Sequence, residues 1–150
     1  ILGGGEEEEK LKFMIYDLGL TTHIFLQGRQ PSQKVRKFYE KADICLLPSL
    51  SEGLSNVALE AMAMEIPVVS TAVGGMWEAI TDGVEGYLVP PYQPDVMAEK
   101  AAILIDDPAL RLRIGKAGRK RIERDFQIDD QIQKFIFEYR NIRYEFFPEN

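Results

Sequence analysis

Two carboxylates, Glu52 and Glu60, stand eight positions apart in a stretch that is otherwise made of apolar and small polar residues. In a helix that starts near Gly53, the rise to Glu60 is about 10 Å at ~1.5 Å per residue. That separation exceeds the ~5 Å between the two carboxyl groups of a retaining glycosidase. The pair is better suited to holding hydroxyl groups at two points of one elongated ligand, such as a nucleotide sugar.

The residues that follow Glu52 predict the start of a helix. Ser51, Ser55 and Asn56 are suitable N-cap residues, and the helix is expected to begin between residues 53 and 56. Its first backbone N–H groups and the positive end of its dipole would point toward the ligand. The helix start is therefore a candidate phosphate-binding site.

The expected helix is apolar on every side, which predicts that it is buried. Glu60 is its only charge before Glu65. Burying a carboxylate without compensation is costly, so Glu60 needs a partner. Two alternatives stay open: hydroxyl groups of a bound ligand, or a cation or backbone donor within the fold.

The elements that position this segment follow an alternating pattern. Short β-rich runs alternate with helical spacing, which indicates βαβ units and an α/β fold with a Rossmann-like, doubly wound parallel sheet flanked by helices. Strands are expected at 1–2, 23–27, 44–47, 68–71 and 87–89. Helices are expected at 11–18 and 35–42, and a helical C-terminal end at 96–105, 110–125 and 128–147.

The run 44–47 has no polar alternation and is expected to be a central strand with both faces covered. The segment that holds Glu52 comes directly after it. Ligands of open α/β sheets bind at the carboxyl ends of the strands, so the expected fold places this segment at the ligand crevice.

Composition excludes several classes of protein. The chain has 150 residues, 18 Lys and Arg against 24 Asp and Glu, and a net charge of -6, which argues against a nucleic-acid binder. One Cys and one His exclude an internal disulfide and a four-ligand zinc site, so no metal is expected. No apolar run is long enough to span a bilayer, and the chain is expected to be soluble and cytoplasmic.

The stretch also resembles a known family. The sequence PSLSEGLSNVALEAMAMEIPVVST is similar to the signature of the retaining glycosyltransferases of group 1 (family 4), whose GT-B fold has two facing Rossmann domains. Further segments occur in the family's usual order, and the resemblance covers about residues 1 to 127. These segments are 1–5 (ILGGG), 18–20, 24–28 (IFLQG), 42–44, 74–78 (GGMWE), 82–86 (DGVEG) and 87–90.

The resemblance implies roles for individual residues. Glu60 would accept hydrogen bonds from the ribose hydroxyls of the donor, and Glu52, as the catalytic residue, would face the transferred sugar. The backbone N–H groups of Gly53, Leu54 and Ser55 would meet the sugar and diphosphate. The nucleobase would lie near 27–30, which contains Gly28 and Arg29.

The resemblance also implies what lies beyond the chain. Residues 1–150 would form the nucleotide-sugar-binding domain, with the first strand, the phosphate-neutralising Arg and Lys and the N-terminal acceptor domain missing. The implied partners are the nucleotide-sugar donor, that N-terminal domain and a carbohydrate or lipid-linked acceptor, with no cofactor. The charge pattern itself adds that seven Arg and Lys residues between 111 and 124 form a basic region, for which a solvated surface is the expected interpretation. The alternatives are a contact with an anionic membrane surface, at the cytoplasmic face, or with the missing domain.

Two positions depart from the family's pattern, since Glu65 stands where Gly is usual and Trp77 where Pro is common. The changes are expected to affect a turn and a loop surface. Two other functions remain as alternatives: a nucleotide-sugar epimerase of the same fold and a nucleotide-binding module without turnover. The aromatic residues of the last helix are expected to pack on the missing domain; they are Phe126, Phe135, Phe137, Tyr139, Tyr144, Phe146 and Phe147.

Overall fold

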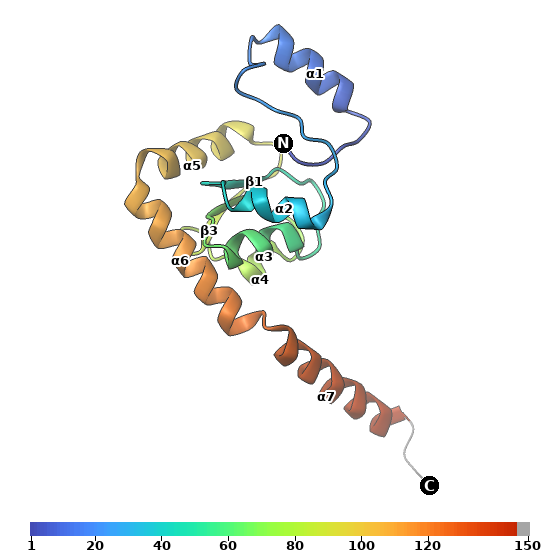
Figure 1. Ribbon diagram of the computed structural model, residues 1–150. Coiled ribbons are helices and arrows are strands. Elements are labelled where there is room, and N and C mark those ends of the chain that lie inside the picture. The colour runs from blue at the N-terminus through green and yellow to red at the C-terminus, as the bar shows by residue number, and fades with distance from the viewer. Residues whose placement is uncertain (147–150) are drawn as a thin grey trace. The chain divides into compact units, whose positions relative to one another are not determined.

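The computed structural model describes the backbone of residues 1–146 and the side chains of residues 1–138. The chain divides into two compact units, Ile1–Lys41 and Ala42–Asn150 (Figure 1). Each unit has its own secondary structure and is described separately below.

The first unit contains two helices, α1 (Glu8–Asp17) and α2 (Ser32–Tyr39), near the two predicted positions. α1 begins with acidic residues, which the positive end of the helix dipole favours. The expected strands 1–2 and 23–27 pair only briefly: the Ile1 amino group donates to the Phe25 carbonyl at 2.7 Å, and the Gln27 N–H donates to the Ile1 carbonyl at 2.9 Å. This pairing is too short to form strands of the described sheet, so that part of the prediction is wrong.

The second unit contains a three-stranded parallel sheet in the order β1-β2-β3, formed by β1 (Cys45–Leu47), β2 (Val68–Thr71) and β3 (Gly86–Val89). All four residues of β2 are buried. β1 lies at the edge of this sheet, and Leu46 is 48% exposed. The prediction that 44–47 is central is therefore wrong for this sheet, because only one side of β1 has a strand beside it.

Five helices accompany the sheet: α3 (Asn56–Ala63), α4 (Met76–Ala79), α5 (Pro94–Asp106), α6 (Pro108–Asp125) and α7 (Ile128–Phe146). α3 and α5 lie on opposite sides of the sheet in Figure 1. The three predicted C-terminal helices are confirmed, and proline occupies the first turn of both α5 and α6. Asp107 caps α6 by accepting the Leu110 N–H at 2.9 Å.

One core cluster joins the sheet to α5 and α6 and contains Val69, Val89, Met97, Leu104 and Ile114. The thiol of Cys45 on β1 is also shielded from solvent, and burial raises its pKa to about 11. It therefore stays protonated at neutral pH, which agrees with the behaviour of a small apolar side chain.

Of the aromatic residues expected to pack beyond the domain, Phe135 and Phe137 are 73% and 62% exposed, whereas the side chains from Tyr139 onward lie outside the described residues.

α3 and α6 cross closely where α6 carries Gly115. A Cβ atom at Gly115 would lie 2.0 Å from the carbonyl oxygen of Glu65, so only glycine fits. Glu65 itself has φ +60, the left-handed conformation that commonly ends a helix. The expectation that this departure from Gly falls in a turn is thus confirmed.

Replacing Glu65 with Gly is expected to stabilise the chain by about 0.5–1 kcal/mol, because glycine adopts this conformation without steric cost. Urea unfolding followed by circular dichroism measures the change. Glu65→Ala is the matched control, since alanine also lacks the carboxylate but keeps the steric cost. A Glu65→Gly protein that is no more stable than the Ala variant would contradict this account.

Candidate functional site

The segment that carries the site, residues 48–55, connects β1 to α3. Hydrogen bonds from two hydroxyl groups at the end of β2 fix the start of this segment. Ser70 Oγ donates to the Leu47 carbonyl at 3.5 Å, and Thr71 Oγ1 donates to the carbonyls of Leu47, at 3.4 Å, and Ser49. The segment therefore leaves the sheet in a direction set by β2, at the carboxyl ends of the strands.

The second attachment of this segment is a glycine turn at Gly74 and Gly75. Gly74 has φ +56, and a Cβ atom on it would lie 1.6 Å from the carbonyl oxygen of Glu52. The Gly75 N–H donates to the Gly53 carbonyl at 3.1 Å. The backbone of Glu52 and Gly53 thus rests directly on the glycine turn, a contact that only the pair of glycines in the sequence could have suggested.

α3 begins at Asn56 with Ser55 as its N-cap, within the predicted range. The Ser55 side chain is buried yet makes no capping hydrogen bond to the helix. The predicted capping by the Ser55 side chain is therefore not part of the structure. Because α3 follows a strand of a parallel sheet, its N-terminus lies at the carboxyl edge, where backbone N–H groups favour an anion.

The burial predicted for Glu60 is wrong. α3 buries only the face that carries Ala58, Ala61 and Met62, which packs toward the sheet and α6. Glu60 is exposed, and Val57 on the same outer face is 43% exposed. The helix is apolar on all sides, yet in the described structure other elements cover only one of its faces. Glu52, in comparison, is half-buried.

The first unit holds the other two predicted binding residues, Gly28 and Arg29. Gly28 has φ +63, and its carbonyl accepts the Gly3 N–H at 2.9 Å. Arg29 is exposed and lies beside Gly4: a Cβ atom on Gly4 would lie 3.8 Å from Arg29 Cγ. The structure therefore brings the glycine-rich N-terminus beside Gly28 and Arg29, a juxtaposition that sequence reasoning did not anticipate.

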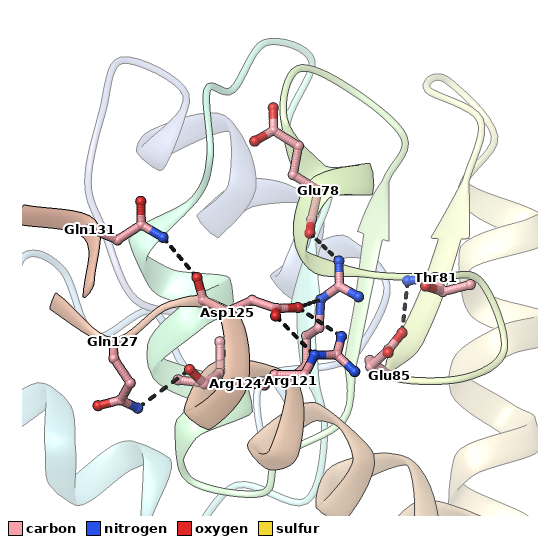
Figure 2. A network of polar contacts seen from close by, with 9 residues as sticks. Glu78, Thr81, Glu85, Arg121, Arg124, Asp125, Gln127 and Gln131 are labelled. Carbon is pink, nitrogen blue, oxygen red and sulfur yellow. Dashed lines mark hydrogen bonds and ion pairs between the residues drawn. The ribbon is translucent and has the colours of Figure 1, made fainter. Parts of the chain in front are cut away.

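A polar network joins α6 to α4, the short helix that follows the glycine turn (Figure 2). Arg121 Nη2 donates to the Glu78 carbonyl at 2.8 Å, and its Nε lies 2.8 Å from Asp125 Oδ2. The hydrogen bond from Arg124 lowers the pKa of Asp125, although desolvation opposes the shift. The buried Glu85 carboxylate accepts the Thr81 N–H at 2.9 Å and holds the chain beyond α4.

This network makes Arg121 a positioning residue for the glycine turn, because α4 starts directly after Gly75. Arg121→Gln is expected to cost about 1–2 kcal/mol and to raise amide hydrogen exchange in 52–55 and 74–79. Arg119 is the matched control: on the same helix, it bonds the Ala63 carbonyl and Glu123 instead. Arg119→Gln should raise exchange near Ala63 only, and identical exchange maps would contradict the assignment.

An apolar hollow of about 330 Å³ opens at the carboxyl ends of the three strands. Each strand contributes one lining residue, namely Leu46, Thr71 and Val89, and Tyr92 and Met97 also line the hollow. Neither Glu52 nor Glu60 lines it. Within the described residues, no cluster of His, Cys, Asp or Glu could hold a metal, and no helix is long and apolar enough to cross a membrane.

The parallel sheet, the flanking helices and a strand-to-helix segment at the carboxyl edge define a Rossmann-like α/β protein. Residues 1–121 match the model of the family described as glycosyl transferases group 1. The chain belongs to this family. Its parallel sheet and flanking helices confirm the predicted α/β fold of GT-B glycosyltransferases.

Individual relatives agree with the family. A D-inositol 3-phosphate glycosyltransferase of Catenulispora acidiphila is 33% identical over 135 residues, which are 90% of this chain and 32% of the relative. Sucrose-phosphate synthase from Thermosynechococcus elongatus superposes with a TM-score of 0.84 at 28% identity, covering 92% of this chain and 35% of that one. TarM of S. aureus, in a complex that includes UDP, gives 0.82 at 27% identity over 91% of this chain and 27% of its own. The chain spans about a third of the length of these proteins.

Proposed function

We propose that this chain is the donor-binding domain of a retaining glycosyltransferase that takes its sugar from a nucleoside diphosphate. The observation that carries the proposal is the placement of Glu52 and Gly53 on the glycine turn, directly before the start of α3. This placement lies inside the region matched by the family. The UDP in the TarM complex supports a nucleoside diphosphate as the ligand.

In this proposal the segment before α3 and the helix itself bind different parts of the donor. The N–H groups of Gly53, Leu54 and Ser55 face the diphosphate, where the helix dipole favours negative charge. Glu60 accepts hydrogen bonds from the ribose, which its exposure allows. Gly28 and Arg29 lie toward the base or the phosphates.

The proposed reaction is a substitution at the anomeric carbon on the face from which the diphosphate leaves. The bond from the anomeric carbon to the diphosphate oxygen breaks, and its electron pair stays on that oxygen. The acceptor oxygen forms the new bond, and its proton passes to the leaving diphosphate. Glu52 orients the sugar, and the N–H groups at the start of α3 stabilise the developing negative charge. No cofactor takes part.

We further propose that residues 1–150 act with an additional domain that binds a carbohydrate or lipid-linked acceptor. The share of the relatives that the chain spans supports this, because two thirds of their length has no counterpart here. Arg and Lys side chains that neutralise the diphosphate would come from the remainder of the protein.

The test uses the complete protein with UDP-, GDP- and ADP-sugars, with and without acceptor sugars, followed by NMR of the products. Transfer or hydrolysis that keeps the anomeric configuration is expected, and Glu52→Gln should slow it at least about a hundredfold. A nucleotide sugar epimerised without acceptor would replace the proposal by an isomerase. Binding without turnover would replace it by a nucleotide-binding module.

A further inference from the structure

α6 carries an unusual concentration of positive charge for this chain. Between Pro108 and Asp125 it has seven Lys and Arg against two Asp and Glu, whereas the rest of the chain has eleven against 22. Four of the seven recur at intervals of three and four residues, which places them along one face of the helix. All four are exposed; they are Arg113, Lys116, Lys120 and Arg124, called the cationic face below.

The other three cations of α6 are engaged within the fold. Arg111 pairs with Asp43 at 3.5 Å, Arg119 with Glu123 at 2.7 Å and Arg121 with Asp125 at 2.8 Å. On the cationic face only Arg124 has a carboxylate, since it shares Asp125 with Arg121.

Across the described part of the chain, no ion pair neutralises Arg113, Lys116 or Lys120. Three charges therefore face solvent unneutralised along about 10 Å of helix, at ~1.5 Å per residue.

A hollow of about 540 Å³ lies beside this face, between α6 and the end of α3. Lys116 and Lys120 line it together with Arg119, and Met64 forms part of its apolar wall. Glu65 and Glu123 also line it, and Arg119 is paired with Glu123. The two lysines thus border a space large enough for a small charged group.

We propose that the cationic face of α6 binds an anionic lipid surface, with lipid phosphates entering the hollow beside Lys116 and Lys120. A bilayer presents its charge as a plane, which suits cations aligned on one side of a helix. Leu112, which directly precedes Arg113 on α6, is 53% exposed and supplies an apolar side chain beside one end of the cationic face. The proposal does not rest on the donor site, because lipid binding needs no nucleotide.

Lipid is favoured over nucleic acid for two reasons. α6 has no aromatic residue on which a base could stack. The chain as a whole is acidic, with a net charge of -6, and would repel a long polyanion that extends past one helix. A membrane contacts the cationic face alone and leaves the acidic remainder in solvent.

The test is co-sedimentation of the chain with vesicles of phosphatidylcholine alone and with vesicles of equal parts phosphatidylcholine and phosphatidylglycerol. Binding to the anionic vesicles only is expected, and it should weaken as salt rises. Neutralising three cations in Arg113→Gln/Lys116→Gln/Lys120→Gln should lower the partition coefficient about a hundredfold. The matched control is Lys34→Gln/Lys37→Gln/Lys41→Gln, which removes three exposed charges near α2 and should change binding less than threefold.

Three outcomes would overturn the proposal. The first is that the wild-type chain does not bind anionic vesicles. The second is that the Lys34/Lys37/Lys41 control loses as much vesicle binding as the α6 variant does. The third is that the wild-type chain binds a DNA duplex as strongly as it binds vesicles and that the α6 variant loses this DNA binding. Circular dichroism checks that each variant is folded. If the triple variant does not fold, Lys116→Gln and Lys120→Gln are tested singly, each with an expected loss of about fivefold; no loss in either would also overturn it.

Discussion

Gly74→Ala is expected to lower the free energy of unfolding by about 3–5 kcal/mol and to abolish measurable nucleotide binding. The new Cβ would lie 1.6 Å from the carbonyl oxygen of Glu52, a separation that no pair of nonbonded atoms can have. The backbone must also keep φ +56, which is costly for alanine. Residues 52–55 would therefore move away from the turn, and the N–H groups at the start of α3 would lose their placement.

Gly83→Ala separates the steric clash with the Glu52 carbonyl from the conformational cost of a positive φ. Gly83 has φ +76, so alanine pays the same conformational cost there. Its Cβ would meet only the Tyr87 ring, at 4.0 Å, which is ordinary contact. A loss of about 1–2 kcal/mol with nucleotide binding retained is expected for this control. Chemical denaturation and ligand-observed NMR of both variants decide the matter, and equal losses would show that the contact with Glu52 has no special role.

Helix positions were predictable from the sequence because local signals determine them. Pro94 and Pro108 mark the starts of α5 and α6, and apolar residues at helical spacing define the face of α6 that carries Ile114. The parallel strands β2 and β3 follow for the same reason, since each is a short apolar run between turns. These elements depend little on what surrounds them.

The errors arose where burial depends on distant parts of the chain. The sequence 44–47 is apolar enough for a central strand, yet β1 has a neighbour on one side only. α3 is apolar throughout, yet its outer face is exposed at Val57 and Glu60. In both cases the apolar composition shows only that the segment could be buried. Which of its faces are buried depends on the elements that pack against it.

The roles of Glu52 and Glu60 stay predictions, and the backbone contacts that support them could not be derived from the sequence. The motif around these two residues indicated the segment between β1 and α3, and the order of strand and helix placed that segment at the carboxyl edge of the sheet. The contact of Gly74 with the Glu52 carbonyl could not be derived, because it joins two loops that are far apart in sequence. The hydrogen bond from Arg121 to the Glu78 carbonyl could not be derived either, since no local signal distinguishes this arginine from the other four on α6.

Glu60→Ala is expected to weaken nucleoside diphosphate binding by about 30- to 150-fold, because the carboxylate would lose charge-assisted hydrogen bonds to the ribose. Urea unfolding of the variant shows whether the loss of binding is accompanied by a loss of stability. Ligand-observed NMR with UDP, GDP and ADP in parallel measures the loss and identifies the preferred base. Glu99→Ala removes another exposed helical carboxylate, on α5, and should leave binding unchanged.

A ligand without ribose hydroxyls makes the assignment specific. The 2′,3′-dideoxy form of the preferred nucleotide should bind the wild-type chain and Glu60→Ala equally weakly. Without ribose hydroxyls, neither protein can form the hydrogen bonds between Glu60 and the ribose. If Glu60→Ala still reduces binding of the dideoxy nucleotide, the glutamate acts through the shape of α3 and not through the ribose. If none of the three nucleotides binds the wild-type chain, residues 1–150 do not form a donor site by themselves, and the phosphate-neutralising cations proposed to lie elsewhere must supply most of the affinity.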